Sequence, residues 1–226
     1  MNPNLTTLQS ILQYQFKDDS LLTTALTHRS SLNEHKGSIS NERLEFLGDA
    51  VLELIISEFL YIEKPTEPEG ILTANRSSIV RTESLAQIAQ NLKLGEYLIM
   101  SRGEENTGGR KNISLLANTT EAIIGAVYLD GGFTNAKSFI ENHLIDHARK
   151  ILATEPLKDN KGLLQELVQK QGFQSPIYKE ILAIGPDHDK TFTVEVMVNN
   201  KPLSRGTGKT KQEAEQSAAQ KALKLL

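Results

Sequence analysis

Acidic side chains in one stretch of the sequence follow the spacing of a single helix face. In NERLEFLGDAVLELIISEF (41–59), Glu42, Glu45 and Asp49 succeed one another at steps of three and four. At about 100° per residue, these steps put the three carboxylates within an arc of roughly 60°. Carboxylates this close repel one another unless a cation or a proton lies among them. The face is therefore expected to bind a metal ion, to carry a raised pKa or to be solvated.

A second stretch, LANTTEAIIGAVYLDGG (116–132), carries Asn118 and Glu121 three residues apart, again on one helix face. Gly48 in the first stretch and Gly125 in the second would let the two helices approach closely. If the helices cross there, they form one oxygen-rich pocket from Glu45, Asp49, Asn118 and Glu121. An all-oxygen, carboxylate-dominated site suits Mg²⁺ or Mn²⁺ and disfavours zinc or copper.

Magnesium in such a pocket predicts hydrolysis of a phosphodiester. Bound ions activate water and stabilise the leaving oxygen, and a pair about 3.5–4 Å apart clamps both ends of an in-line displacement. The spacing alone is equally compatible with helix-capping or surface carboxylates, so both interpretations stay open.

The elements that must position these residues are helical. Residues 5 to about 150 show helical periodicity, interrupted by glycine-containing loops at 65–70 and 102–112. The first acidic stretch also has an apolar stripe, expected in the core, made of Leu44, Leu47, Val51, Leu54 and Ile55. This part of the chain is predicted to be all-α.

From Gly162 the pattern changes to helix, three strands and helix. FTVEVMV (192–198) alternates apolar and other residues, as a sheet covered on one side requires. Asn199-Asn200 favours a tight hairpin turn before a short third strand. The last helix is expected to pack on the sheet through Ala214, Ala218, Ala222 and Leu225. The predicted fold is multidomain, with an all-α domain at 1–153, a linker at 154–161 and an α-β-β-β-α (α+β) domain at 162–226.

Composition excludes several classes of protein. The 226 residues are 38% hydrophobic with a net charge of −3, typical of a soluble globular protein. Without cysteine there are no disulfides, thiolate nucleophiles or cysteine zinc sites. We see no signal peptide and no apolar run long enough to span a membrane, so a cytoplasmic protein is expected.

The sequence resembles the ribonuclease III family. The motifs that carry the resemblance occur in the family's order and are LQYQFKDDSLLTTALTHRS (12–30), ERLEFLGDAVL (42–52), LGEYLIMSRGEENTGGR (94–110) and LANTTEAIIGAVYLDGG (116–132). The α-β-β-β-α segment resembles the double-stranded-RNA-binding domain that follows the nuclease domain in bacterial members. The resemblance covers essentially the whole chain.

The resemblance implies a magnesium-dependent endoribonuclease, with Mn²⁺ able to replace Mg²⁺, that cuts double-stranded RNA in ribosomal and messenger RNA processing and decay. The products would carry 5′-phosphate and 3′-hydroxyl ends with two-nucleotide 3′ overhangs. The resemblance places Glu45, Asp49, Asn118 and Glu121 at the metal positions, with Asp49 and Glu121 catalytic. It adds Glu42 and Glu69 as further acids near the cut.

Asn118 departs from the family, which usually has aspartate at this position. An amide oxygen still ligates magnesium, but the site loses one negative charge, so we expect weaker metal binding. The alternative function is a protein that binds double-stranded RNA with impaired or absent cleavage.

A homodimer is expected because an RNA duplex has two antiparallel strands related by approximate two-fold symmetry, which a C₂ pair of sites would match. Phe46 lies about 100° from Glu45 around the helix, off the acidic face. The resemblance implies that it packs into the partner subunit, and a core phenylalanine is the alternative.

Three regions of the second domain are expected to contact RNA, through phosphates and 2′-hydroxyls rather than base edges. The residues are Gln165 and Glu166 in the first helix, Pro186 and His188 in the loop GPDHDK (185–190), and Lys209, Lys211 and Gln212 at the start of the last helix. Lysines at a helix N-terminus favour phosphate, and Thr210 with Glu213 makes a capping box. Ordinary solvated side chains are the alternative for each region.

A glycine-rich segment and three basic residues could also bind phosphate. GTGKT (206–210) suggests a phosphate-binding loop, but the earlier glycine of that motif would fall on Leu203, so no nucleotide cofactor is expected. Arg76, Arg110 and Lys111 could touch phosphates near the cut, although exposed surface charge is the default for each.

Overall fold

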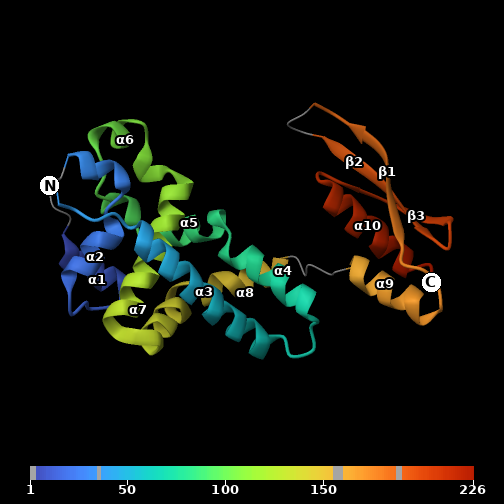
Figure 1. The fold of residues 1–226 in the computed structure, drawn as a ribbon, viewed down its shortest axis with the longest axis horizontal. Coiled ribbons are helices and arrows are strands. Elements are labelled where there is room, and N and C mark those ends of the chain that lie inside the picture. The colour runs from blue at the N-terminus through green and yellow to red at the C-terminus, as the bar shows by residue number, and fades with distance from the viewer. Residues whose placement is uncertain (1–3, 35–36, 155–159, 187–189) are drawn as a thin grey trace. The chain divides into compact units, whose positions relative to one another are not determined.

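The computed structural model describes residues 4–34, 37–154, 160–186 and 190–226, which belong to two compact units, Met1–Pro156 and Leu157–Leu226 (Figure 1). The first unit is helical. Its α-helices are α1 (Leu5–Leu12), α2 (Asp19–Leu26), α3 (Glu42–Glu63), α4 (Glu69–Val80), α5 (Thr82–Asn91), α6 (Arg102–Asn106), α7 (Ile113–His143) and α8 (Ile145–Thr154). Short 3₁₀ helices cover Arg29–Asn33, Leu94–Glu96 and Gly109–Lys111. The all-α prediction for this part of the chain is confirmed.

Side-chain caps define where several of these helices begin. The Asp18 side chain accepts a hydrogen bond from the Ser20 N–H at the start of α2. Asn112 accepts from the N–H groups of Ser114 and Leu115 at the start of α7. Each cap satisfies backbone donors that have no partner within the helix. The cap on α7 matters for the site because Asn118 lies in the next turns of that helix.

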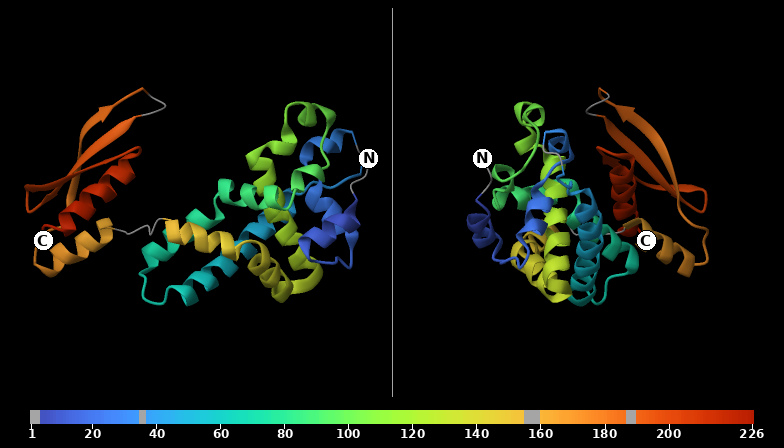
Figure 2. Two further views of the ribbon diagram at one scale, coloured as in Figure 1. Left: turned by 180° about the vertical axis from the view of Figure 1, so that it is seen from behind. Right: turned by 60° about the vertical axis from the view of Figure 1, so that its left-hand side comes forward.

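Helices α3 and α7 form the centre of the first unit, and α2 and α5 also pack on α7 (Figures 1 and 2). The crossing of α3 and α7 is very close. A β-carbon on Gly48 would lie 1.8 Å from the carbonyl oxygen of Glu121, and one on Gly125 would lie 2.3 Å from the carbonyl oxygen of Leu44. Both positions therefore require glycine, as the close approach inferred from the sequence demands.

The long helix α7 changes direction at the end of LANTTEAIIGAVYLDGG. Gly132 adopts φ 76° and ψ −177°, which interrupts the helical geometry between its two segments. Just before this break, Asp130 accepts a hydrogen bond of 2.7 Å from the Tyr14 hydroxyl. The N-terminal segment is thus fastened to α7 where α7 bends.

The apolar stripe of α3 differs from its prediction at one position. Leu44, Val51 and Ile55 are buried as expected, but Leu54 is 58% exposed. Phe46, at 80% exposed, also lies on the outside. The prediction that Leu54 belongs to the core was wrong, because the outer face of α3 carries large apolar side chains as well as the inner one.

The second unit contains α9 (Asn160–Lys170), β1 (Ile177–Ile184), β2 (Thr191–Val198), β3 (Lys201–Gly208) and α10 (Lys211–Leu223). The strands form an antiparallel sheet in the order β1-β2-β3, and α9 and α10 pack together, with α10 also packing on β2 and β3 (Figure 2). The predicted α-β-β-β-α order is confirmed.

Local predictions in this unit hold with two corrections. Val194, Val196 and Val198 of β2 are buried, and Asn199 and Asn200 have φ of 51° and 60°, as a tight hairpin turn requires. The third strand was expected to be short but has eight residues, like the other two. Leu225 was expected in the core but is 65% exposed, because α10 ends at Leu223.

Replacing Gly48 by alanine should destabilise the protein by about 3 kcal/mol or more, because the new β-carbon meets backbone atoms that cannot move independently. Urea unfolding followed by circular dichroism measures the change. Gly103→Ala is the matched control, since the nearest atom to its added β-carbon is the Ser101 hydroxyl at 3.8 Å. Equal stability of the two variants would contradict a tight crossing.

Candidate active site

The crossing of α3 and α7 brings the predicted metal-binding residues together. Glu45 and Asp49 come from α3, and Asn118 and Glu121 come from α7. Glu45, Asn118 and Glu121 are half-buried, and Asp49 is exposed. The Asn118 side chain of α7 lies close enough to Glu45 of α3 to favour the charged form of that carboxylate. The site thus has a half-buried wall and an open side at Asp49.

Burial and mutual repulsion disfavour the charged forms of the carboxylates in the cluster. Burial raises the pKa of Glu121 to about 7, and the negative charges of Asp49 and Glu45 add to this shift. Burial also raises the pKa of Glu45, with a further contribution from Glu42, while the hydrogen bond from Asn118 opposes the shift. A cation among these side chains would favour their charged forms and lower these pKa values.

The donor set fits a hard divalent cation, although the side chains are not closed around one. Within the described residues, no group of three histidine, aspartate or glutamate side chains is in position to hold a metal ion. Three carboxylates and one amide oxygen from two rigid helices are the oxygen ligands that magnesium prefers.

A hollow of about 180 Å³ lies beside the cluster. Its lining includes Glu42, Glu45 and Asn118, together with His28 and Arg29. The Arg29 guanidinium lies 3.4 Å from a Glu42 carboxylate oxygen. The sequence did not place His28 or Arg29 at the site, although both belong to the motif at 12–30. Their position there emerges only from the packing of 27–31 against the start of α3.

Glu42 lies close to the cluster, whereas Glu69 lies far from it. The second carboxylate oxygen of Glu42 accepts a 2.9 Å hydrogen bond from the Ser40 hydroxyl, which holds it at the rim of the hollow. Glu69 is exposed at the start of α4 and accepts from the Thr73 hydroxyl. From Glu45 to the end of α3 is about 27 Å at 1.5 Å per residue, and Glu69 follows that far end. The structure does not bring Glu69 to the cluster within one protomer.

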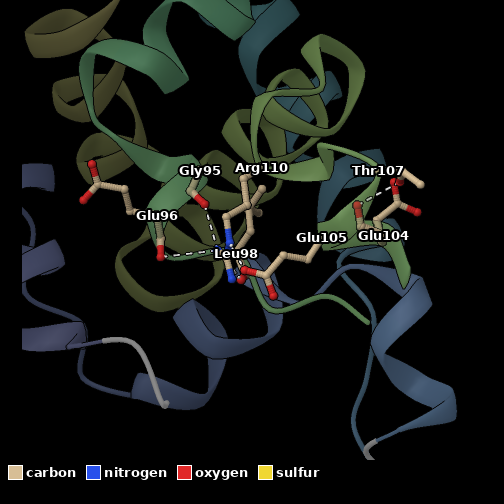
Figure 3. A network of polar contacts seen from close by, with 7 residues as sticks. All are labelled: Gly95, Glu96, Leu98, Glu104, Glu105, Thr107 and Arg110. Carbon is tan, nitrogen blue, oxygen red and sulfur yellow. Dashed lines mark hydrogen bonds and ion pairs between the residues drawn. The ribbon is translucent and has the colours of Figure 1, made fainter. Parts of the chain in front are cut away.

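The guanidinium of Arg110 is engaged inside the protein. Figure 3 shows it among the backbone carbonyls of Gly95, Glu96 and Leu98, with Nη1 at 2.9 Å from the first and 3.0 Å from the last. Its Nε lies 2.6 Å from a Glu105 carboxylate oxygen, and this hydrogen bond holds the pKa of Glu105 below its usual range. Arg110 therefore joins the 102–112 loop to the segment after α5.

Arg76 is also held internally. Its Nη1 donates a 2.9 Å hydrogen bond to the Ser57 hydroxyl of α3. Lys111 is exposed beside α7. Of the three basic residues weighed as phosphate contacts, two have structural partners.

The described residues proposed to contact RNA lie on the surface of the second unit. Gln165 and Glu166 of α9 are exposed between the buried Leu164 and Val168, and Pro186 is exposed after β1. His188 lies outside the described residues. The end of β1 and the starts of α10 and α9 follow one another along one side of this unit in both views (Figures 1 and 2).

The start of α10 has the predicted cap with one addition. The Thr210 hydroxyl accepts from the Glu213 N–H, and the Glu213 carboxylate accepts a 2.8 Å hydrogen bond from the Lys209 N–H. Lys211 is exposed and its Nζ lies 2.8 Å from a Glu180 carboxylate oxygen of β1. Lys209, Lys211 and Gln212 are all accessible to a ligand.

Comparison with known families agrees with both units. Residues 18–148 match the family model described as Ribonuclease-III-like, and residues 161–226 match the double-stranded RNA binding motif. The chain belongs to the ribonuclease III family. It is accordingly an endoribonuclease with a double-stranded-RNA-binding domain, as the sequence motifs predicted.

Relatives in this family match nearly the whole chain. Ribonuclease 3 of Protochlamydia amoebophila is 45% identical over 96% of this chain and 89% of its own length. Ribonuclease 3 of Borreliella burgdorferi is 47% identical over 95% of this chain and 88% of its own length. The nuclease domain of ribonuclease III from Campylobacter jejuni superposes with a TM-score of 0.60 at 44% identity, covering 63% of this chain and 97% of that domain. That nuclease domain is described as structurally flexible in a region involved in dimer formation.

No helix in residues 4–34, 37–154, 160–186 and 190–226 has both the length and the apolar character that are needed to cross a lipid bilayer.

The metal-free protein should lose stability as the pH rises. In the unfolded chain Glu121 releases its proton near 4.5, whereas the folded protein holds it to about pH 7. Between these values the folded state binds more protons, so stability falls over this range and levels off above it. Urea midpoints in EDTA from pH 4.5 to 8 measure the effect, and Glu121→Gln should flatten the profile. An unchanged profile in the variant would assign the pH dependence to other groups.

Proposed function

We propose that this chain hydrolyses phosphodiester bonds of double-stranded RNA with Mg²⁺, or Mn²⁺ in its place, held by Glu45, Asp49, Asn118 and Glu121. The products are 5′-phosphate and 3′-hydroxyl ends with two-nucleotide 3′ overhangs. The substrates are ribosomal and messenger RNA duplexes in processing and decay, in the cytoplasm. The observation that carries this proposal is the convergence of these oxygen donors where α3 and α7 cross.

The surroundings of each side chain are consistent with its proposed role in metal binding or catalysis. A bound magnesium ion would lower the pKa of a water molecule and stabilise the negative charge on the leaving oxygen. Asp49 and Glu121 are the proposed catalytic pair, and Asp49, as the exposed one, meets the RNA side of the site. Half-buried Glu121 must give up the proton that its environment favours before it can act as a ligand. Glu45 and Asn118 contribute one oxygen ligand from each of the two helices.

Asn118 is the feature that favours the alternative function, RNA binding with little cleavage. Its amide donates to Glu45, so it satisfies one carboxylate of the cluster without any metal. An aspartate there would instead add a negative charge, which only a cation or a proton could relieve. Asn118 therefore lowers the gain from binding magnesium. The difference concerns metal affinity and leaves RNA binding by the second domain intact.

Asn118→Asp should shift the magnesium dependence of cleavage to roughly tenfold lower concentration, because the site regains one negative charge beside the ion. A long RNA duplex is incubated with each protein over a Mg²⁺ titration, and the products are sized. Short duplex products with two-nucleotide overhangs from both proteins support the endonuclease. Identical titration curves would refute the effect of Asn118, and intact duplex with both proteins would favour the binding-only alternative.

We also propose a homodimer in which Phe46 packs against the partner. An exposed phenylalanine on the outer face of the helix that bears the cluster supports this, as does the dimer-forming region described for the related Campylobacter jejuni nuclease domain. A two-fold axis across α3 would run the two α3 helices antiparallel. The far end of α3 in one subunit, followed by Glu69, would then lie near the Glu42 and Glu45 end in the other. This gives Glu69 a route to the cut that a single protomer does not offer.

The double-stranded-RNA-binding unit is proposed to hold the duplex through Gln165 and Glu166, Pro186 and His188, and Lys209, Lys211 and Gln212. Exposure of the described members along one side of the unit supports this surface. Double-stranded RNA recognition by shape and phosphate needs no base contacts. No nucleotide cofactor is proposed.

The double variant Lys209→Ala with Lys211→Ala should bind duplex RNA more weakly and reduce the slope of log K against log salt by about one to two, because each lost phosphate contact releases fewer counter-ions. Filter binding at several salt concentrations measures both. Lys201→Ala is the matched control, since it removes an exposed lysine at the start of β3, at the opposite end of that strand from Gly208 and the start of α10. An unchanged slope in the double variant would remove these lysines from the phosphate contact.

A further inference from the structure

Lys211, one of the proposed phosphate contacts, is held by the sheet on which α10 packs. Its Nζ lies 2.8 Å from a Glu180 carboxylate oxygen of β1 and 5.9 Å from the centre of the Phe192 ring of β2. Glu180 lies opposite the buried Val194 in the pairing of β1 with β2, so its side chain projects from the face of the sheet that α10 covers. The Lys211 side chain therefore runs from the start of α10 toward β1.

Close packing fixes the backbone on both sides of this ion pair. A β-carbon on Gly208, at the end of β3, would lie 2.5 Å from the Glu213 β-carbon and 2.6 Å from the Ala214 nitrogen. The first turn of α10 therefore lies directly against β3, which is joined through β2 to β1. Separation of the pair thus requires rotation of the two side chains rather than movement of α10.

Other carboxylates at the start of α10 have different partners. The Glu213 carboxylate accepts from the backbone N–H four residues before it, and a Glu215 carboxylate oxygen lies 2.6 Å from Lys161 Nζ of α9. The carboxylate that pairs with Lys211 is Glu180. The hydrogen bond to Glu180 and its negative charge raise the pKa of Lys211, so the lysine is charged at neutral pH and the pair is ionic.

A phosphate of a bound duplex and the Glu180 carboxylate would use the same ammonium group. Both are anions that accept hydrogen bonds from a lysine Nζ, and the N-terminus of α10 adds a preference for phosphate. The side chains of Lys211 and Glu180 are 65% and 39% exposed, so a ligand can reach the pair. An ion pair this exposed contributes little to folding stability. Its main consequence is therefore for ligand binding.

We propose that Glu180 limits the strength of RNA binding by competing with phosphate for Lys211. The inference rests on the proposed RNA-binding surface and adds a residue that acts on RNA only through this lysine. A duplex must displace the carboxylate before it gains the Lys211 contact. The displaced carboxylate then lies as a like charge near the phosphate. Weaker holding of the duplex by this unit favours release of the cut RNA, a step that limits turnover in many enzymes.

Glu180→Gln should tighten duplex RNA binding by about threefold to tenfold at low salt, because Lys211 becomes available to phosphate. The slope of log K against log salt should become steeper by up to about one. Glutamine keeps the size of the side chain and removes its charge. Filter binding of the full-length protein to a long RNA duplex in EDTA, at several salt concentrations, measures both quantities without cleavage.

Glu195→Gln is the matched control. Glu195 lies between the buried Val194 and Val196 in β2, so its side chain projects from the opposite face of the sheet, where it lies 2.8 Å from Arg205 Nε. This variant also removes one negative charge and releases one cation, but on the face that α10 does not cover. Affinity and slope should be unchanged. A gain equal to that of Glu180→Gln would assign the effect to net charge and overturn the inference.

Combined variants test whether the effect passes through the lysine. In the Lys211→Ala background, Glu180→Gln should leave RNA binding unchanged, since there is no lysine to release. A gain that persists in that background would overturn this inference alone, and so would a Glu180→Gln protein that binds RNA no more tightly than the wild type while Lys209→Ala with Lys211→Ala weakens binding. If neither Glu180→Gln nor that double variant changes binding, the proposed phosphate contact at the start of α10 fails as well.

Discussion

The close approach of two helices governs this protein. Where α3 crosses α7, the carbonyl oxygen of Glu121 occupies the space that a β-carbon on residue 48 would need. Glycine at positions 48 and 125 leaves neither helix with a β-carbon that would clash with the other. The backbones can then approach closely enough for side chains next to the crossing to share one pocket. Any residue with a side chain at either glycine would push the oxygen donors apart.

Ionised carboxylates in the cluster at this crossing destabilise the folded protein. Glu121 is half-buried among other negative charges, and its pKa is raised to about 7 as a result. Perturbed carboxylates in a partly buried pocket are typical of sites whose counter-charge is a ligand. Asn118 moderates this cost through its hydrogen bond to Glu45.

Helix α3 has three faces with different surroundings. Its inner face packs in the core, its acidic face lies at the crossing, and its outer face exposes Phe46, Leu54 and Tyr61. Three faces are possible because a helix of 22 residues offers about six turns of side chains in every direction. The active site and the proposed dimer contact are thereby coupled through one rigid element. A shift of α3 at one of these contacts would also move its residues at the other.

Much of this organisation could be predicted from the sequence, because it depends on local periodicity. Steps of three and four placed Glu45 and Asp49 on one helix face, and strict alternation around Val194 and Val196 identified a strand covered on one side. The tight turn at Asn199 likewise follows from a residue that tolerates positive φ. Such signals require only the geometry of a single element, and the order of helices and strands followed from them.

Only the tertiary structure decided which elements meet and which faces remain outside. Periodicity assigned Leu54 to the core, but a helix cannot show from its own pattern which of two apolar faces finds a partner within the chain. The same applies to Arg110, whose guanidinium is bound by carbonyls from a separate segment, and to Arg29 beside Glu42. Contacts between distant segments depend on how the elements pack, and for the acidic cluster this is the close crossing of α3 and α7 at Gly48.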